Sequence, residues 1–197
     1  MERMDILQSL LAENNDVLLA SKAVQAGLSR FDLSKFTERG VLERVGRGVY
    51  VTHSGMGDEL FSLQERAKKI VYSHETALFL HGMTDRTPNR YSITVPSYYK
   101  ASQAVKDKCK VYYIKPDLLT LGLTELPSGM GHQVVAYDLE RTICDVTRSR
   151  NKIDGQIFID ALKNYVLRRD MDLNRVNGYA HKLGVYKILR KYLEVLL

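Results

Sequence analysis

The sequence predicts an α+β protein, with a small helical module at its N-terminus and a larger mixed domain behind it. Apolar positions recur three or four apart up to Phe36 and then nearly alternate from Val41 to Val51, which indicates helices followed by a hairpin. Strand-like runs, separated by loops that contain proline or glycine, follow at residues 91–95, 111–114 and 133–137. From Asp138 onward the pattern is almost entirely helical. We therefore expect a winged helix-turn-helix domain at 1–52, a glycine-rich linker at 53–58, and a domain with a small β-sheet and a helical C-terminal tail at 59–197.

The N-terminal module has recognisable helix start and stop signals. An apolar stripe over residues 4–11 predicts a helix that ends near Asn14. A short second helix fits residues 21–26, with Ser21 as its N-cap. Ser29 and Asp32 form a capping-box pattern that begins a third helix. Gly40 ends that helix, and the hairpin that follows completes a winged helix-turn-helix pattern.

Two more helices are predicted between the linker and the first strand. Apolar spacing from Leu60 to Val71 indicates a connecting helix. Ser73 is placed to cap another helix, which Gly82 ends.

Composition excludes several classes of protein. No apolar run approaches the roughly 20 residues of a membrane helix, and the charged N-terminus is unlike a secretory signal, so we expect a cytoplasmic protein without membrane association. Two cysteines, Cys109 and Cys144, provide neither a disulfide framework nor a cysteine metal site, and we expect both to be packed thiols. The patterns that would indicate a cofactor, such as a phosphate-binding Walker loop, are absent from the sequence.

The positive charge is unevenly distributed. The chain carries a formal net charge of +6, which favours polyanionic partners. Residues 1–60 hold seven basic and nine acidic residues, a balance of −2, whereas residues 20–50 alone have a balance of +3. The acidic residues of this region therefore concentrate away from the third helix and the hairpin.

The third helix and the hairpin predict an interface with double-stranded DNA. With Leu33 and Phe36 facing the core, the opposite helix face presents polar side chains to the major groove. At the hairpin tip, Arg47 between two glycines is placed to reach the minor groove or a phosphate. The predicted DNA-binding residues are Lys22, Arg30, Ser34, Lys35, Glu38, Arg39, Arg44 and Arg47. The alternative is a winged module that contacts only proteins and leaves Arg47 solvated.

Two acidic or histidine-containing motifs raise the question of an enzyme. His74 and His81 are seven residues apart instead of the four that a zinc-binding helix needs, so structural histidines are favoured. Asp138, Glu140 and Asp145 could form a metal or proton-transfer site in a nuclease-like or nucleotide-processing enzyme. Asp138 also sits at an N-cap position, and Arg141 and Asp145 have ion-pair spacing, so we expect no catalytic residue, metal or cofactor here.

The last fifty residues supply most of the chain's excess positive charge. Residues 148–197 contain eleven basic and five acidic residues, a balance of +6. A solvated helical face explains this balance, and an auxiliary phosphate-binding surface is the alternative. The residues proposed for that surface are Arg168, Arg169, Lys187, Arg190 and Lys191.

The order of the motifs resembles the AbiEi family of bacterial type IV antitoxins, which function in phage abortive infection. The motifs that carry the resemblance are GVLERVGRGVYV, SHETALFLHGMTD, YSITVPS, YDLERTICDVTRSR and the helical end from ALKNYV to KYLEVLL. The resemblance implies an N-terminal module that represses its own operon at inverted repeats. It also implies a C-terminal domain that counteracts a nucleotidyltransferase-like toxin without forming a stable complex with it. The alternative function is a one-component regulator whose second domain senses a ligand or dimerises.

Overall fold

The computed structural model describes residues 2–52 and 58–197. The chain divides into two compact units, each of which is described by itself. One unit comprises Met1–Lys68 and Pro127–Val134, and the other comprises Lys69–Leu126 and Val135–Leu197. Most of the predicted linker, residues 53–57, lies outside the described residues, and the predicted domain ranges stay a prediction.

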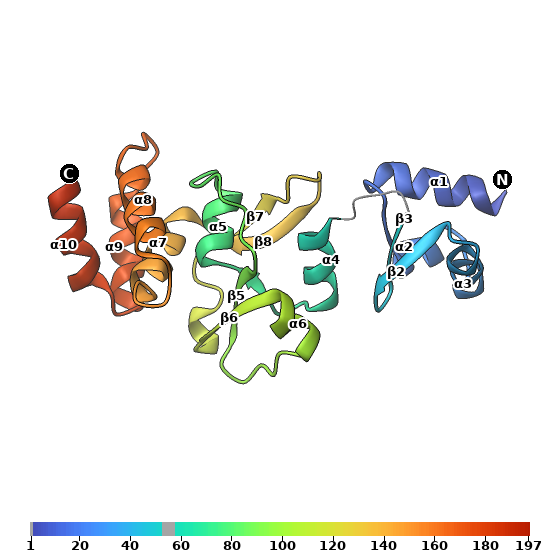
Figure 1. Cartoon of the computed structure of the whole chain (residues 1–197), viewed down its shortest axis with the longest axis horizontal. Helices are drawn as coiled ribbons and strands as arrows, with labels where there is room; N and C mark the ends of the chain where they lie inside the picture. The colour runs from blue at the N-terminus through green and yellow to red at the C-terminus, as the bar shows by residue number, and fades with distance from the viewer. Residues whose placement is uncertain (1, 53–57) are drawn as a thin grey trace. The chain divides into compact units, whose positions relative to one another are not determined.

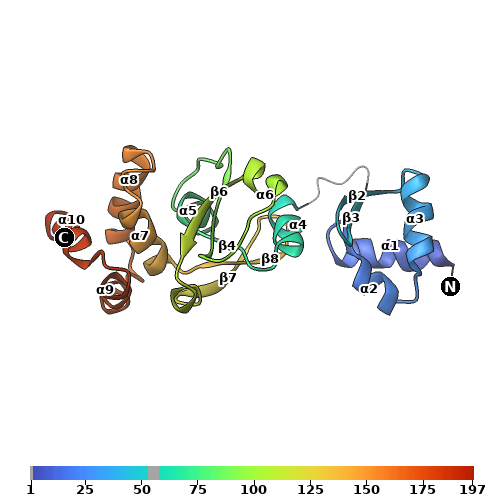
Figure 2. The same cartoon turned by 90° about the horizontal axis from the view of Figure 1, so that it is seen from below.

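The first unit packs three helices against a small sheet (Figures 1 and 2). The helices are α1 (Arg3–Glu13), α2 (Ala20–Gln25) and α3 (Arg30–Glu38), and the strands are β1 (Val17–Leu19), β2 (Leu42–Gly46) and β3 (Val49–Thr52) in the order β1-β3-β2. Leu7, Leu18, Leu33, Phe36 and Leu42 lie in the shared core. The mixed helix-and-strand fold class and the three-helix-plus-hairpin pattern are confirmed.

The third helix begins and ends as its sequence signals predict. The Ser29 hydroxyl accepts the Asp32 amide at 3.1 Å, and the Asp32 carboxylate accepts the Ser29 amide at 2.8 Å, so the capping box is present. At the other end Gly40 has a φ of +70°, and the Val41 amide reaches back to the Phe36 carbonyl at 2.9 Å. This left-handed glycine closes α3 and turns the chain into β2.

The start of the second helix was predicted wrongly. Its N-cap is Leu19 instead of Ser21, and the cap provides no side-chain hydrogen bond. Leu19 is also the last residue of β1, where it pairs with Val49, so the chain passes directly from strand to helix. The Ala20 amide donates to the Gly48 carbonyl at 2.8 Å, so a backbone group of the hairpin replaces a side-chain cap.

The predicted connecting helix is shorter than its apolar spacing indicates. Helix α4 spans Glu59–Arg66, and the Asp58 carboxylate caps it by accepting the Phe61 amide at 2.9 Å. Val71 lies in a strand instead, because β4 (Val71–Tyr72) is buried between β5 and β8. Phe61 of α4 packs against Val17, Val49 and Val51, the sheet face opposite the three-helix core.

The second unit contains most of a five-stranded mixed sheet in the order β6-β5-β4-β8-β7. Strands β5 (Tyr91–Pro96), β6 (Cys109–Ile114) and β8 (Gln133–Tyr137) confirm the three predicted runs, whereas β4 and β7 (Leu123–Pro127) were missed. Strands β5 and β6 are parallel, and the missed helix α6 (Gln103–Lys108) lies in the connection between them. A crossover of this kind is what a parallel pair requires.

Helices α7 to α10 gather beside one another and, with α5 (His74–Leu80), share one large core (Figures 1 and 2). Their bounds are α7 (Leu139–Arg148), α8 (Gly155–Val166), α9 (Leu173–Lys182) and α10 (Tyr186–Leu196). Asp138 caps α7 by accepting the Arg141 amide at 2.8 Å, as predicted. Cys109 and Cys144 are both buried and form no disulfide, which confirms the expectation of packed thiols. Within residues 2–52 and 58–197, no helix has the length and apolar character that crossing a membrane requires.

Candidate functional site

The first unit forms a groove between the start of α2, one side of α3 and the hairpin of β2 and β3. Its volume is about 700 Å³. Three arginines line it: Arg30 from α3, Arg44 from β2 and Arg47 from the turn between the strands. The remaining lining residues are Leu19, Ala20, Ser21, Ser34, Thr37, Gly48, Val49, Tyr50 and Glu65. Basic side chains from three separate segments therefore meet at one concave surface.

Helix α3 exposes the face that its periodicity predicts. Asp32, Leu33 and Phe36 are buried, whereas the predicted outer residues Phe31, Ser34, Lys35 and Glu38 and the flanking Arg30 and Arg39 are exposed. The Phe31 ring is 64% exposed, and the Lys35 ammonium lies 4.6 Å from its centroid. The Ser34 hydroxyl lies 3.5 Å from a Glu38 carboxylate oxygen. This helix face thus offers an apolar ring, a cation and a hydroxyl group together.

The capping box places a buried carboxylate, that of Asp32, beneath this face. Asp32 is buried at the start of α3 and also forms an ion pair with Arg3 of α1. Hydrogen bonds from the Ser29 hydroxyl and amide, followed by the Arg3 guanidinium, lower the pKa of Asp32. Hydrogen bonds and a cation of the first unit therefore stabilise the ionised form of the Asp32 carboxyl group.

The hairpin presents Arg47 on an exposed two-residue turn. Gly48 has a φ of +74°, which favours glycine at this position, and a bulge lies between Arg44 and Gly46. Gly46 has a different role, because a Cβ there would overlap the Arg66 side chain. Arg66 crosses the strand to donate to the Val45 carbonyl at 2.6 Å. Gly48 thus allows the backbone conformation of the turn, and Gly46 leaves space for the Arg66 side chain of α4.

Half of the predicted DNA-binding residues line the groove, and half lie outside it. Arg30, Ser34, Arg44 and Arg47 are members of the lining. Lys22, Lys35, Glu38 and Arg39 are exposed but are not members, and the Lys22 ammonium is bound by the Asn14 side chain at 2.5 Å. Sequence reasoning missed Thr37 and Tyr50. Thr37 could have been found, since positions 30, 34 and 37 share one helix face.

The residues considered for an enzymatic site have structural partners in the second unit. His81 Nε2 lies 2.9 Å from the Tyr137 carbonyl, and Asp145 pairs with Arg141 at 3.1 Å. Glu140 is buried, with its carboxylate 3.8 Å from the Arg175 guanidinium. Among the described residues, no three His, Cys, Asp or Glu side chains lie in a group suited to a metal ion.

The basic residues of the tail belong to the second unit and differ in their partners. Arg168 is held by Asp170 at 2.7 and 2.8 Å, and Arg190 by Glu194 at 2.6 Å. These carboxylates raise the pKa of both guanidinium groups. Lys187 and Lys191 are exposed on α10 with Arg190, and Arg169 is exposed in the turn after α8. Whether these residues bind phosphate stays a prediction.

Comparison with known proteins finds a similarity for the N-terminal segment. Residues 5–53 match the family model AbiEi_4, described as "Transcriptional regulator, AbiEi antitoxin". A search of curated protein sequences gave no match. The RV2827C protein from Mycobacterium tuberculosis has a similar fold, with a TM-score of 0.59 and 14% identity over 96% of this chain and 79% of that one. The matched segment is the three-helix module with its hairpin, and the family of the match is the one that the sequence motifs resemble.

Proposed function

We propose that this protein is the antitoxin of a bacterial type IV toxin–antitoxin system and that it also represses its own promoter by binding inverted repeats. The family match of residues 5–53 supports the regulator class. The observation that carries the DNA-binding function is the groove where Arg30, Arg44 and Arg47 meet beside the exposed face of α3.

The chemistry of the two exposed elements suits the two grooves of DNA. A recognition helix lies in the major groove, where Ser34 and Lys35 can bond to base edges and the Phe31 ring can contact a thymine methyl group. An arginine on a thin turn reaches phosphate or the minor groove, which is the place of Arg47. Arg30 and Arg44, between these elements, are suited to the intervening backbone phosphates.

The local arrangement of charge explains how this module can bind DNA although its net charge is negative. Residues 1–60 have a balance of −2, but three arginines converge on one surface. The buried Asp32 is paired with Arg3, so it contributes little net negative charge to that surface. Short-range phosphate contacts depend on such local geometry more than on the total charge.

The antitoxin activity is assigned to the residues beyond the winged module. We propose that they counteract a nucleotidyltransferase-like toxin without a stable complex and without catalysis by this chain. The support is the order of motifs from SHETALFLHGMTD to KYLEVLL, which resembles that of AbiEi antitoxins. The cellular site of this activity is the cytoplasm.

Promoter binding is tested by mobility-shift titration at fixed salt with the protein's own upstream DNA and a scrambled fragment of equal length. Wild type should prefer the upstream DNA, and the double variant Arg30→Ala/Arg47→Ala should bind it at least tenfold more weakly. Lys163→Ala removes a cation exposed on α8 and should bind as wild type does. Equal binding by wild type and the double variant would exclude the groove as the interface.

Toxin neutralisation is tested by growth rescue when the adjacent toxin gene is co-expressed. Wild type and Arg30→Ala/Arg47→Ala should both restore growth, because the substitutions affect only the DNA-binding surface. Co-purification of the toxin at stoichiometric yield would contradict a type IV mechanism. Failure of wild type to restore growth would favour the one-component regulator.

A further inference from the structure

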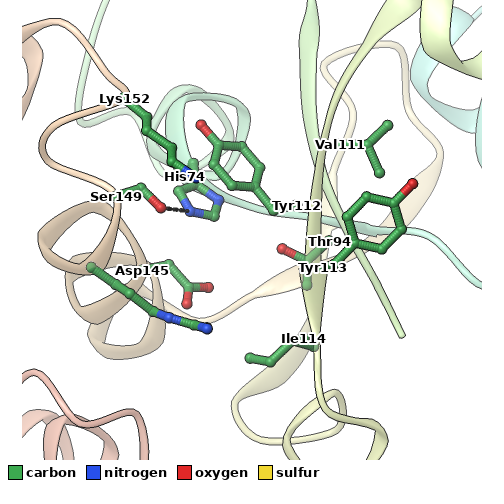
Figure 3. A pocket seen from close by; sticks show the side chains of 10 residues that line it. His74, Thr94, Val111, Tyr112, Tyr113, Ile114, Asp145, Ser149 and Lys152 are labelled. Carbon is green, nitrogen blue, oxygen red and sulfur yellow. Dashed lines mark hydrogen bonds between the residues drawn. The ribbon is translucent and has the colours of Figure 1, made fainter. Parts of the chain in front are cut away.

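A pocket of about 280 Å³ in the second unit, between α5, β5, β6 and the end of α7, contains polar groups that bind one another (Figure 3). His74 Nε2 lies 3.0 Å from Ser149 Oγ, the contact drawn as a dashed line. His74 Nδ1 lies 2.9 Å from Ser73 Oγ, which also accepts the Thr94 hydroxyl at 2.8 Å. The Tyr112 ring stacks on the imidazole with centroids 3.5 Å apart. These polar groups therefore have their partners inside the fold.

The hairpin of the first unit, in contrast, is bound by a helix outside the segment that matches the family. The match covers residues 5–53, and α4 follows it in the chain. Phe61 of α4 and Val45 of β2 pack against one apolar cluster, on the face of the small sheet that points away from the three-helix core. Arg66, the last residue of α4, reaches the hairpin itself. A fourth helix thus supports the hairpin.

Arg66 is bound to the two-residue segment that separates Arg44 from Arg47. Its Nη1 donates to the Val45 carbonyl at 2.6 Å. Its Nε donates to the Ser62 carbonyl, one turn back on α4, at 3.1 Å. One guanidinium group therefore links the backbone of the helix to the backbone of the hairpin. The donors of a guanidinium group have a fixed planar arrangement, which the single ammonium group of a lysine does not provide.

The hairpin has the space and the free carbonyl group that this contact needs. A bulge lies between Arg44 and Gly46, so Val45 has no opposite residue on β3, and its carbonyl group can accept a side chain. At Gly46 a Cβ would overlap the Cγ and Cδ atoms of Arg66. The bulge and the missing side chain thus make room for Arg66 directly beside Arg47.

Helix α4 is also fixed to the first unit at its start. The buried Asp58 carboxylate caps the helix and accepts the Ser128 hydroxyl. His132 Nδ1 lies 3.0 Å from the same carboxylate, and His132 Nε2 lies 3.0 Å from the Asn14 carbonyl. The His132 ring stacks on Phe61, with centroids 4.2 Å apart. The helix is therefore held at both of its ends.

We propose that Arg66 is a positioning residue for DNA binding, which holds the hairpin so that Arg44 and Arg47 keep their places at the groove. This inference rests on the proposed DNA-binding function. Arg44 and Arg47 flank the segment that Arg66 contacts, so movement of Val45 and Gly46 would displace both guanidinium groups. Holding the hairpin in place before DNA binds reduces the entropy that binding costs. The DNA-binding unit therefore extends beyond residues 5–53 into α4.

Mobility-shift titration of the full-length protein with its own upstream DNA tests this role. Arg66→Ala should weaken binding about three- to tenfold, the loss expected from one hydrogen-bonded contact. Arg66→Lys should weaken it to a similar extent, because an ammonium group lacks the planar donors. Lys163→Ala, which removes an exposed cation from α8, should bind as wild type does. Wild-type affinity in either Arg66 variant would overturn the proposal.

Gly46→Ala tests the same contact from the side of the hairpin. The backbone of Gly46 lies outside the left-handed region, so alanine fits it, and the new Cβ displaces the Arg66 side chain. Gly46→Ala should therefore lose about as much affinity as Arg66→Ala. The double variant Gly46→Ala/Arg66→Ala should lose no more than either single variant. Full affinity in Gly46→Ala, or additive losses in the double variant, would contradict the proposed contact.

A second double-mutant cycle separates positioning from a direct phosphate contact. In the Arg44→Ala/Arg47→Ala background, Arg66→Ala should change affinity less than about twofold, because the side chains that Arg66 positions are gone. A direct phosphate contact would persist in that background. Its loss would then lower the slope of log affinity against log salt by about 0.9, and this result would overturn the positioning role.

Hydrogen exchange tests the contact without DNA. Amides of residues 42–52 should exchange about three- to tenfold faster in Arg66→Ala than in wild type, whereas those of α3 should be unchanged. Arg66 is exposed, so circular dichroism should show an unchanged fold. Equal exchange in the hairpin would overturn the proposal. If wild type shows no preference for the upstream DNA, the proposed promoter binding fails whatever the exchange result, so the two failures are distinguishable.

Discussion

Arg141 and Asp145 form an ion pair one turn apart on α7 in which neither side chain reaches solvent. Arg141 Nε lies 3.1 Å from Asp145 Oδ2, and the two side chains are 0% and 3% exposed. The same guanidinium donates to the carbonyls of Leu118 and Leu121 at 2.9 and 2.8 Å and lies over the Tyr137 ring. Gly122 is needed beside it, because its φ is +78° and a Cβ there would lie 2.7 Å from Arg141 Cβ. One buried cation thus joins α7 to the loop before β7.

Arg141→Leu should destabilise the protein strongly, because it leaves the Asp145 carboxylate buried without its partner. Breaking a buried pair in this way lowers the free energy of unfolding by about 3–5 kcal/mol. Urea denaturation measures the change. The control is Arg190→Ala, which breaks an exposed ion pair with Glu194 one turn away on α10 and should cost less than about 1 kcal/mol. Equal costs for the two variants would contradict the special role of Arg141.

The ionisation of Asp145 should lower the free energy of unfolding as the pH rises from about 4 to about 6. Burial raises its pKa from 3.8 to about 6, against the opposing effect of Arg141. Between these values the folded state binds more protons than the unfolded state, so this group's contribution to stability decreases with rising pH. Denaturation of wild type and Asp145→Asn at pH 4.5 and 6.5 should show the stability advantage of wild type shrinking at the higher pH. Arg168 lowers the pKa of the exposed Asp170, so the contribution of Asp170 to stability increases with rising pH. Asp170→Asn therefore serves as the control.

Ser29→Ala should weaken α3 without removing any predicted DNA contact. The hydroxyl caps the Asp32 amide, and loss of such a cap costs about 1 kcal/mol. Chemical denaturation tests the cost. Ser34→Ala changes an exposed serine of the same helix and should leave the unfolding free energy within about 0.5 kcal/mol of wild type. If the two variants have equal stability, the capping box does not stabilise the helix.

Arg47→Ala should lower affinity for the protein's own promoter while leaving the fold intact. The side chain is exposed on the turn, and one lost phosphate or minor-groove contact costs about 1–3 kcal/mol. Mobility-shift titration at matched salt provides the measurement. Lys35→Ala tests the helix in the same assay and should also alter sequence preference. Unchanged affinity in the first variant would remove the turn from the interface, and unchanged affinity and preference in the second would remove the outer face of α3.

The basic tail is tested through the dependence of affinity on salt. If α10 contacts DNA, Lys187→Ala/Lys191→Ala should weaken binding to specific and random DNA alike and lower the slope of log affinity against log salt by about 1.8. We expect Arg168→Ala/Arg190→Ala to change the slope less, because Asp170 and Glu194 already hold those side chains. Binding curves at several salt concentrations decide the matter. An unchanged slope in the lysine variant would mean that this helix surface is simply solvated.

Local sequence signals determined much of the secondary structure. Ser29, Gly40 and Asp138 mark helix ends correctly because capping depends on residues three or four apart. Strands β5, β6 and β8 were predictable because their side chains carry the strand pattern within single runs. The outer face of α3 followed from helical periodicity alone.

Tertiary structure decided what depends on partners distant in the chain. Val71 lies in a strand because β4 pairs with β5 and β8. Ser21 is not the N-cap of α2 because the pairing of β1 with β3 continues to Leu19, directly before that helix. The groove gathers Arg30, Arg44 and Arg47 only when the hairpin folds beside α3. The pocket at His74 joins residues from four segments, and no local spacing relates His74 to Ser149, 75 positions away. Periodicity tells which side chains face a core, whereas the pairing of strands and the packing of helices determine which of them meet.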